Sequence, residues 1–398
     1  MRYKTILILL GLLIFLPSFL YQATAQETET APPEDDPIYD RPFITDFGNT
    51  AVGGYVEGNT NYFSEDGISE GFSMELRRFN IFLYSSIGSR ISFFSELEFE
   101  HGTEEIALET ALVDFELSPG FILRGGIILP PLGMFNENHD GPKWDIIDRP
   151  LVSTELIPST LSEVGFGVHG RFFASQLAFG YQVYLVNGLG DGIVSNAENR
   201  TFIPAGKNEE MFGEDNNGRP ALTARISAQH LEIGEIGLSF YNGIYNSYRI
   251  EGEEIADKNR LSLMALDASV DIRGVTLQGE LAYASIKVPA SLEDVFGDKQ
   301  LGGFIEAIVP ILRPQIFDLQ ETVLNLITRF ERLDYNVGSF QSTGDTIYDD
   351  VTALVLGVSF RPTSETVFKA NYRHHWIRDL IGNPIRLGGF QVGFATYF

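Results

Sequence analysis

Residues 93–100 read FFSELEFE, a stretch in which apolar and acidic side chains largely take turns. Leu97 and Phe99 fall on one parity, and Glu96 and Glu98 fall on the other. Successive side chains of a β-strand point to opposite faces, so this pattern predicts a strand with one apolar and one charged face. The same period of two recurs along most of the chain and predicts an all-β protein.

Sixteen segments of strand length carry this alternation. They lie near 48–63, 73–87, 90–101, 104–117, 120–129, 163–173, 176–187, 220–231, 234–245, 260–271, 274–287, 300–311, 321–334, 351–361, 366–378 and 385–398. Short turns alternate with longer loops between them, and only 312–320 departs from this rule. We therefore expect a transmembrane antiparallel β-barrel of about 16 strands, between about 14 and 18, with short periplasmic turns and long extracellular loops.

The composition excludes several other classes. Without any Cys the chain has no disulfide or zinc–thiolate framework. Its 31 Phe and 16 Tyr argue against disorder, and its net charge of −26 argues against binding to nucleic acid. Beyond the N-terminus no apolar run reaches the roughly 18 residues of a transmembrane helix. The apolar residues are dispersed, as the predicted strands require.

The N-terminus has the features of a secretory signal peptide. Arg2 and Lys4 precede an uncharged stretch over 6–20, and Ala-Thr-Ala follows at 23–25. The segment behind it is acidic and rich in Pro, which is typical of a flexible leader. The expected organisation is a signal peptide (1–25), a flexible leader (26–45) and a transmembrane barrel (46–398).

The C-terminal strand ends in alternating aromatic residues. Phe390, Phe394 and Phe398 share one face. This ending resembles the signal by which bacterial outer-membrane barrels are recognised, so we expect the barrel-assembly machinery to bind through Phe398. An even number of strands places both termini on the periplasmic side.

Three further segments carry a family resemblance. They are GGIILPPLGMFNENHD (125–140), DRP (148–150) and IPSTLSEVGFGVHG (157–170). With the sixteen strands, they resemble the bacterial outer-membrane porin superfamily, closest to the phosphate-selective porin O and P family. The resemblance implies a water-filled channel and a homotrimer. Phosphate selectivity in that family depends on basic residues in the bore, and the acidic balance of this chain departs from that, so we do not carry the phosphate preference over.

The connection over 130–162 is unusual because it combines five Pro with apolar and charged residues. Pro fixes the backbone and removes hydrogen-bond donors, so this segment is stiff and outside the strand ladder. We expect a constriction loop that folds into the barrel, although an ordinary loop packed over the barrel mouth would fit the same residues. Its candidate pore residues are Glu137, Asp140, Lys143, Asp145, Asp148 and Arg149.

Charged residues also occur at inward-facing positions of the strands, where they would line a water-filled bore. These candidates are Arg78, Glu96, Glu98, Asp114, His169, Arg171, Arg225, Glu280, Arg329, Lys369 and Arg373. One interpretation is that acidic and basic walls face each other across the constriction and set ion preference. The other is that these residues hydrate the lumen and pair with one another. The sequence leaves both open.

Enzyme and metal motifs are weak. The chain has no G-x-S-x-G, H-E-x-x-H or phosphate-binding glycine loop, and we expect neither catalytic residues nor a cofactor. His139 and Asp140 form a single dyad, without a further His nearby to complete a metal site. Glu214, Asp215 and Asn217 could hold Ca²⁺, but a solvated loop explains them better.

These observations predict an outer-membrane porin for passive diffusion of ions and small hydrophilic solutes. One alternative is a substrate-selective channel for anions, phosphate or hydrophobic compounds. The inward parity is mostly polar or Gly, which argues against an apolar lumen. A non-conducting structural barrel is a further alternative. The expected partners are outer-membrane lipid and small hydrophilic solutes.

Overall fold

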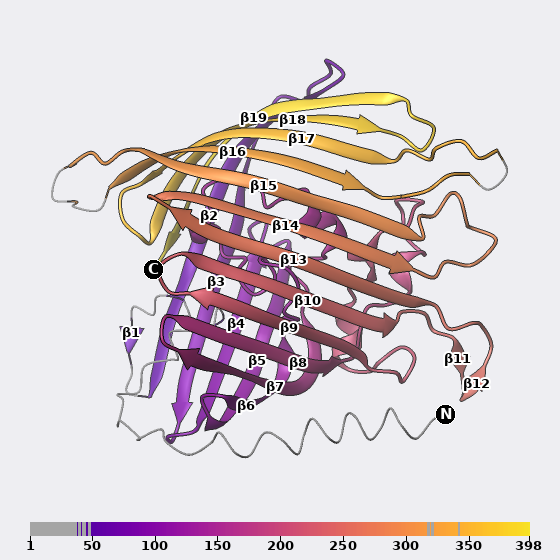
Figure 1. The fold of residues 1–398 in the computed structure, drawn as a ribbon, viewed down its shortest axis with the longest axis horizontal. Helices are drawn as coiled ribbons and strands as arrows, with labels where there is room; N and C mark the ends of the chain where they lie inside the picture. The colour runs from indigo at the N-terminus through magenta and orange to yellow at the C-terminus, as the bar shows by residue number, and fades with distance from the viewer. Residues whose placement is uncertain are drawn as a thin grey trace.

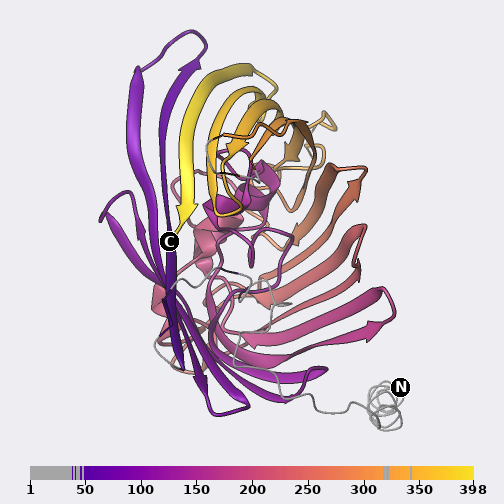
Figure 2. The same cartoon turned by 90° about the vertical axis from the view of Figure 1, so that its left-hand side faces the viewer.

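A computed structural model describes residues 38, 41, 45–46, 49–316, 319, 322–340 and 343–398. Sixteen antiparallel strands form one closed ring, as Figures 1 and 2 show. The ring closes because the last strand, β19 (Pro384–Tyr397), pairs with β2 (Thr50–Glu65). The predicted all-β barrel of sixteen antiparallel strands is therefore confirmed.

The strands between these two follow one another in chain order around the ring. They are β3 (Phe72–Ile87), β4 (Ile91–Glu100), β5 (Glu105–Ser118), β6 (Phe121–Ile128), β7 (Glu163–Ala174), β8 (Leu177–Val186), β9 (Ala221–His230), β10 (Gly234–Ile244), β13 (Arg260–Ile272), β14 (Val275–Ile286), β15 (Lys299–Leu312), β16 (Val323–Asp334), β17 (Asp350–Arg361) and β18 (Thr366–Arg378). Every observed end lies within two residues of its predicted position.

Three short strands lie outside the ring of sixteen. β1 (Thr45–Asp46) pairs with the start of β2, and β11 (Arg249–Ile250) pairs with β12 (Glu253–Glu254) in a separate hairpin. In the described part of the chain, no helix has the length and apolar character needed to cross a membrane.

Tight turns join the strands at one end of the barrel. The turn between β13 and β14 consists of Arg273 and Gly274, with φ values of 56° and 79°. Positive φ at both central residues is the geometry of the tight hairpin turn that matches strand twist. The longest connections, 130–162 and 187–220, lie at the opposite end, whereas the ten-residue connection 313–322 lies at the turn end, as the predicted exception requires.

The alternation of side chains separates an apolar outside from a mixed inside. Ile226, Ile305 and Phe390 are exposed on the outer face, whereas Asn80 and Glu96 are fully buried in the interior. A ring without edges pairs every strand with two neighbours, which is what a hydrocarbon surrounding demands. The outer face is therefore suited to lipid.

The interior contains more apolar surface than we expected from the sequence. Phe82, Phe94 and Leu112 point inward from the wall and belong to one buried cluster with Phe135 and Leu156 of the loop over 130–162. We predicted that the inward-facing residues of the strands are mostly polar or Gly. That prediction is incomplete, because it left out these apolar wall residues. The reason is that apolar loop residues inside the barrel need apolar partners on the wall.

Two long connections supply this internal packing, and Figure 2 shows their short helices inside the ring of strands. Residues 130–162 carry η2 (Gly141–Lys143) and η3 (Val152–Leu156). Residues 187–220 carry η4 (Asp191–Ile193), η5 (Ile203–Gly206) and η6 (Glu209–Phe212). Ile193 and Ile203 of the second connection belong to the same buried cluster.

Gly54 tests the closure of the ring. A Cβ atom there would overlap the Asn80 carbonyl oxygen and lie 2.6 Å from Phe398 Cζ, so Gly54→Val should prevent β2 from seating between β3 and the C-terminus. We expect loss of the compact, heat-modifiable band on gel electrophoresis after refolding in detergent. The control is Gly338→Val, because Gly338 has open space around it. Normal folding of Gly54→Val would contradict the described closure.

Candidate functional site

Asp148 of the constriction loop (130–162) forms hydrogen bonds with four strands of the wall. Its carboxylate accepts hydrogen bonds from Arg77 at 2.8 Å, from Gln391 at 2.8 Å and from Arg373. Its carbonyl oxygen accepts from Arg329 at 2.8 Å. Burial opposes ionisation of Asp148, but the adjacent Arg373 and Arg77 hold its carboxyl pKa well below the ordinary value. One loop residue therefore joins β3, β16, β18 and β19.

A second anchor of the same loop is Asp145. Its carboxylate accepts from Ser359 at 2.5 Å and from Arg361 at 2.9 Å, both in β17. Lys369 of β18 donates to the Gly141 carbonyl at 2.8 Å. These bonds attach the first half of the constriction loop to the same side of the wall as Asp148.

Further bonds attach the constriction loop to other strands around the ring. Glu280 of β14 accepts from the Met134 amide at 2.7 Å and from the Ser153 hydroxyl at 2.9 Å. Arg225 of β9 donates to the Gly133 carbonyl at 3.2 Å. Partners around so much of the ring place this loop within the bore and not above it.

Arg41, from the segment before β2, also lies in the interior. Its guanidinium donates to Glu96 of β4 at 2.6 Å and to Asp140 of the constriction loop at 2.8 Å, and it stacks over the Phe82 ring. Ile38 is fully buried in the same apolar cluster. The prediction of a flexible leader over 26–45 is therefore wrong for these two residues, since an ion pair and apolar contacts hold them inside. The predicted signal peptide lies outside the described residues.

Several charged wall residues form ion pairs with a residue on the adjacent strand or on the next strand but one. Arg124 and Asp114 form a two-bond ion pair with separations of 2.8 and 2.7 Å, and His169 lies 3.6 Å from the same carboxylate. Arg225 and Asp267 form a similar pair at 2.6 and 2.7 Å. This local pairing agrees better with the interpretation that these residues hydrate the lumen and pair with one another than with an acidic wall facing a basic wall.

Other predicted pore residues follow the same arrangement. Arg78 lies 2.6 Å from Glu100 and 3.5 Å from Glu98, and Arg329 lies 2.6 Å from Glu306. Four further predicted residues hydrogen-bond to uncharged side chains. Their partners are Gln229 for Arg171, Gln182 for Glu137, Asn138 for Lys143 and Thr160 for Arg149.

Two cavities remain on either side of the constriction loop. The turn-side cavity has a volume of about 350 Å³ and is lined by residues that include Glu116, Arg171 and Glu235. The loop-side cavity has a volume of about 480 Å³, and Glu105 and Lys207 are among its lining residues. The two cavities share no lining residue. Residues of the constriction loop line both cavities, among them Glu137 for the turn-side cavity and Arg149 for the loop-side cavity.

The loop-side cavity carries two neighbouring cations. Arg149 and Lys207 donate to the hydroxyl and the carbonyl of Thr160, at 3.1 and 3.4 Å. Burial, together with the positive charges of Arg78 and Arg77, lowers the pKa of Arg149 to about 10. Arg149 remains charged at neutral pH, and Arg149, Lys207 and Glu105 line the same cavity.

The oxygen-rich loop that could have held Ca²⁺ does not bring its carboxylates together as metal ligands among the described residues. Asp215 accepts from the Asn217 amide at 2.9 Å, Asn217 donates to the Ile244 carbonyl at 2.9 Å, and Glu214 is exposed. Among the described residues, the grouping with metal-ligand spacing is instead that of Glu96, Glu98, Glu109 and His139.

Sequence reasoning missed Glu109 and Arg41. The ladder between β4 and β5 shifts register where Glu96 pairs with Thr110 and Leu97 pairs with Leu108, so Glu109 is the extra residue of a bulge. A bulge breaks the period of two, and no alternation could therefore assign Glu109 to the interior. Arg41 lies in a segment without periodicity, and only its isolation among acidic residues could have drawn attention to it.

Comparison with known proteins gives the fold. No family model matches the chain. A protein of Aquifex aeolicus (strain VF5), itself uncharacterized, is 27% identical over 353 residues, which cover 84% of this chain and 78% of that protein.

Solved outer-membrane proteins have a similar architecture. The outer membrane channel DcaP of Acinetobacter baumannii has a TM-score of 0.57 at 12% identity, covering 89% of this chain and 99% of that one. The anion-selective porin from Comamonas acidovorans has a TM-score of 0.55 at 12% identity, covering 88% of this chain and 99% of that one. Salmonella typhi OmpF has a TM-score of 0.55 at 12% identity, covering 90% of this chain and 100% of that one. The chain thus has the sixteen-strand barrel fold of porins.

Asp148 provides a test of the anchoring. Asp148→Asn should leave Arg77 and Arg373 without their carboxylate, so the constriction loop should become more mobile. We expect larger current fluctuations and a higher mean single-channel conductance in planar bilayers. Asp298→Asn is the control, because Asp298 is half exposed in another loop and only contacts Lys299 at 3.6 Å. Identical current traces for Asp148→Asn and the wild type would argue against anchoring by this residue.

Arg41 provides a test of the internal position of its segment. Arg41→Met leaves Glu96 and Asp140 buried without their shared cation, which should lower the free energy of unfolding by about 3–5 kcal/mol. Urea unfolding in detergent, followed by tryptophan fluorescence, measures this change. Arg90→Met, in an exposed turn, should change it by less than about 1 kcal/mol. A similar small effect for Arg41→Met would place Arg41 outside the barrel.

Proposed function

We propose that this protein is an outer-membrane channel for passive diffusion of ions and small hydrophilic solutes, and that it is not an enzyme. The observation that carries the proposal is the constriction loop, held inside a closed sixteen-strand barrel by bonds to strands around the ring. A barrel of this size is wide enough for water, and an internal loop narrows it without blocking both ends. The charged side chains beside the two cavities suit hydrated solutes.

Location and assembly belong to the same proposal. The apolar outer face supports insertion in outer-membrane lipid, and the N-terminal segment supports export by a cleaved signal peptide. Recognition by the barrel-assembly machinery would use the C-terminal Phe398, whose backbone already bonds to Gly54 of the first barrel strand. A homotrimer is supported by the likeness to one solved structure, OmpT of Vibrio cholerae in its trimer form.

A second candidate is a substrate-selective channel. It is favoured by the two cavities, because residues of the constriction loop line both of them and could contact a solute in each. Membership of the phosphate-selective O and P family rests on the segments between 125 and 170 alone. Paired charges along the wall do not favour one sign of ion, so we propose weak cation selectivity or none.

Liposome swelling tests the proposed function. Liposomes with the refolded protein should admit a pentose quickly, a disaccharide slowly and a tetrasaccharide hardly at all, because the constriction loop limits size. In planar bilayers under a salt gradient, the reversal potential should lie near zero or indicate slight cation preference.

Three results would contradict this proposal in different ways. Saturable uptake of a single solute class would favour the substrate-selective channel. A strongly anion-selective reversal potential would overturn the expectation for ions. Absence of both swelling and conductance would favour a structural barrel.

A further inference from the structure

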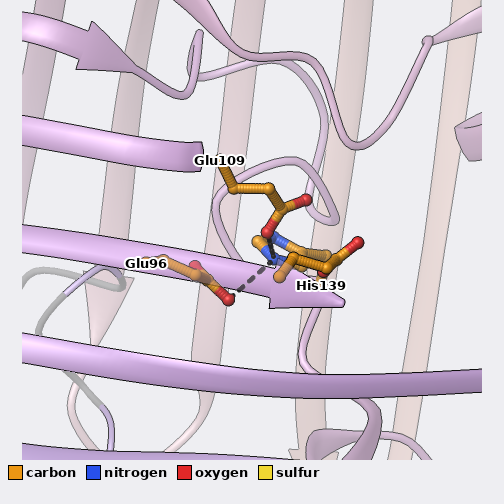
Figure 3. Close-up of side chains that lie close together, drawn as sticks. Glu96, Glu109 and His139 are labelled. Carbon is orange, nitrogen blue, oxygen red and sulfur yellow. Dashed lines mark hydrogen bonds and ion pairs between the residues drawn. The ribbon is translucent and has the colours of Figure 1, made fainter. Parts of the chain in front are cut away.

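Three glutamates and one histidine meet inside the barrel at the point where the constriction loop approaches the wall. Glu96 and Glu98 come from β4, Glu109 comes from the bulge of β5, and His139 comes from the constriction loop. We call these four residues the His139 cluster. All four are buried, and one ligand atom from each lies within 4.8 Å of the others. Figure 3 shows Glu96 and Glu109 reaching His139 from two sides.

From this arrangement we propose that the His139 cluster binds a divalent transition-metal ion. The ion would join the constriction loop to β4 and β5. The proposal does not depend on the proposed channel function, because it concerns only how these four side chains are neutralised and held. An imidazole together with carboxylates suits Zn²⁺ and its neighbours, whereas Ca²⁺ and Mg²⁺ prefer oxygen ligands alone.

The distances fit a small ion. His139 Nε2 lies 3.0 Å from Glu109 Oε2 and 3.7 Å from Glu96 Oε1. Bonds of about 2.0–2.2 Å in a tetrahedral zinc site separate neighbouring ligand atoms by about 3.4 Å, which lies between these two values. Small side-chain rotations would therefore be enough to close the four ligand atoms around an ion.

The histidine is oriented as a metal ligand would be. His139 Nδ1 lies 3.1 Å from the Asn136 carbonyl oxygen, which can only accept a hydrogen bond. With Nδ1 donating to this carbonyl, Nε2 is the ring nitrogen that faces the carboxylates. It donates to Glu109 Oε2 at 3.0 Å, and a metal ion would replace that proton. Donation of the second ring N–H to a backbone carbonyl is the usual support for a metal-binding imidazole.

The local charge also favours a divalent cation. Four carboxylates gather here, those of the three cluster glutamates and that of Asp140, whose Oδ1 lies 3.8 Å from His139 Nε2. Arg41 bonds to two of them, and Arg78 lies 3.5 Å from a third while also pairing with Glu100. Two guanidinium groups thus leave about two negative charges to be neutralised in a buried place.

Two hydroxyl groups beside the cluster give an independent indication of a ligand. Tyr55 and Thr110 are fully buried, and neither hydroxyl oxygen has a hydrogen-bond partner among the described residues. Thr110 pairs with Glu96 across the ladder, so their side chains share the inner face. Tyr55 pairs across the ladder with Asn80, whose side-chain amide donates to both Glu96 and Glu98 at 2.7 Å. Buried hydroxyls are normally bonded, and water held by an ion would supply their partner.

Zinc binding to the refolded protein in detergent tests the proposal. Titration calorimetry with ZnCl₂ should give one strong site per chain for the wild type. His139→Gln and Glu109→Gln should each weaken the affinity at least about tenfold, because each removes one ligand. His230→Gln is the matched control, since His230 ends β9 next to the β9–β10 turn and its imidazole accepts from the Glu232 amide at 3.3 Å. It should bind Zn²⁺ like the wild type.

A second measurement covers the case in which a variant fails to fold. X-ray absorption at the zinc edge of the wild type should give nitrogen and oxygen ligands at about 2.0–2.2 Å, including one imidazole. Anomalous diffraction should place the zinc between β4, β5 and the constriction loop. The proposal is overturned by no binding to the wild type, by equal binding to His139→Gln, or by zinc located elsewhere. The first result would mean that His139, Arg41 and Arg78 stabilise the buried carboxylates without a metal ion.

Discussion

The requirement that every backbone polar group be paired governs this molecule. In a hydrocarbon surrounding an open sheet edge is not tolerated, so the chain must return its last strand to its first. The pairing of β19 with β2 meets that requirement, and Gly54 allows Phe398 to approach closely enough. Once the ring is closed, charged and polar side chains of the strands are accommodated in the interior, where the constriction loop and the charged wall residues lie.

Inside the ring, charges are buried at a cost that only close partners offset. This explains why Asp148, Asp145 and Arg41 each bond to groups from more than one segment. It also explains why wall charges of opposite sign lie next to each other. The same pairing that stabilises the constriction loop also lets positive and negative charges on the wall largely cancel, so that a permeating ion would meet a weaker electric field.

The strands were predictable because half of each faces lipid and half faces the interior, which imposes a period of two on the sequence. The loop contacts were not, because they depend on which wall residues the closed ring places opposite one another. Asp148 could be suspected as a pore residue from its place in a Pro-rich loop, but nothing in the sequence connects it to Arg373. Glu109 was hidden by a bulge, and Arg41 by a segment without periodicity.

The separation of anchors along the chain has a consequence for the order of folding. Asp148 and Arg373 lie 225 positions apart, and Asp145 and Arg361 lie 216 positions apart. Contacts of such long range form late, since the intervening chain must first be ordered. The constriction loop is therefore synthesised long before β16, β17, β18 and β19, which supply many of its anchors. It can take its final position only when the last strands join the ring, so its seating reports that assembly is complete.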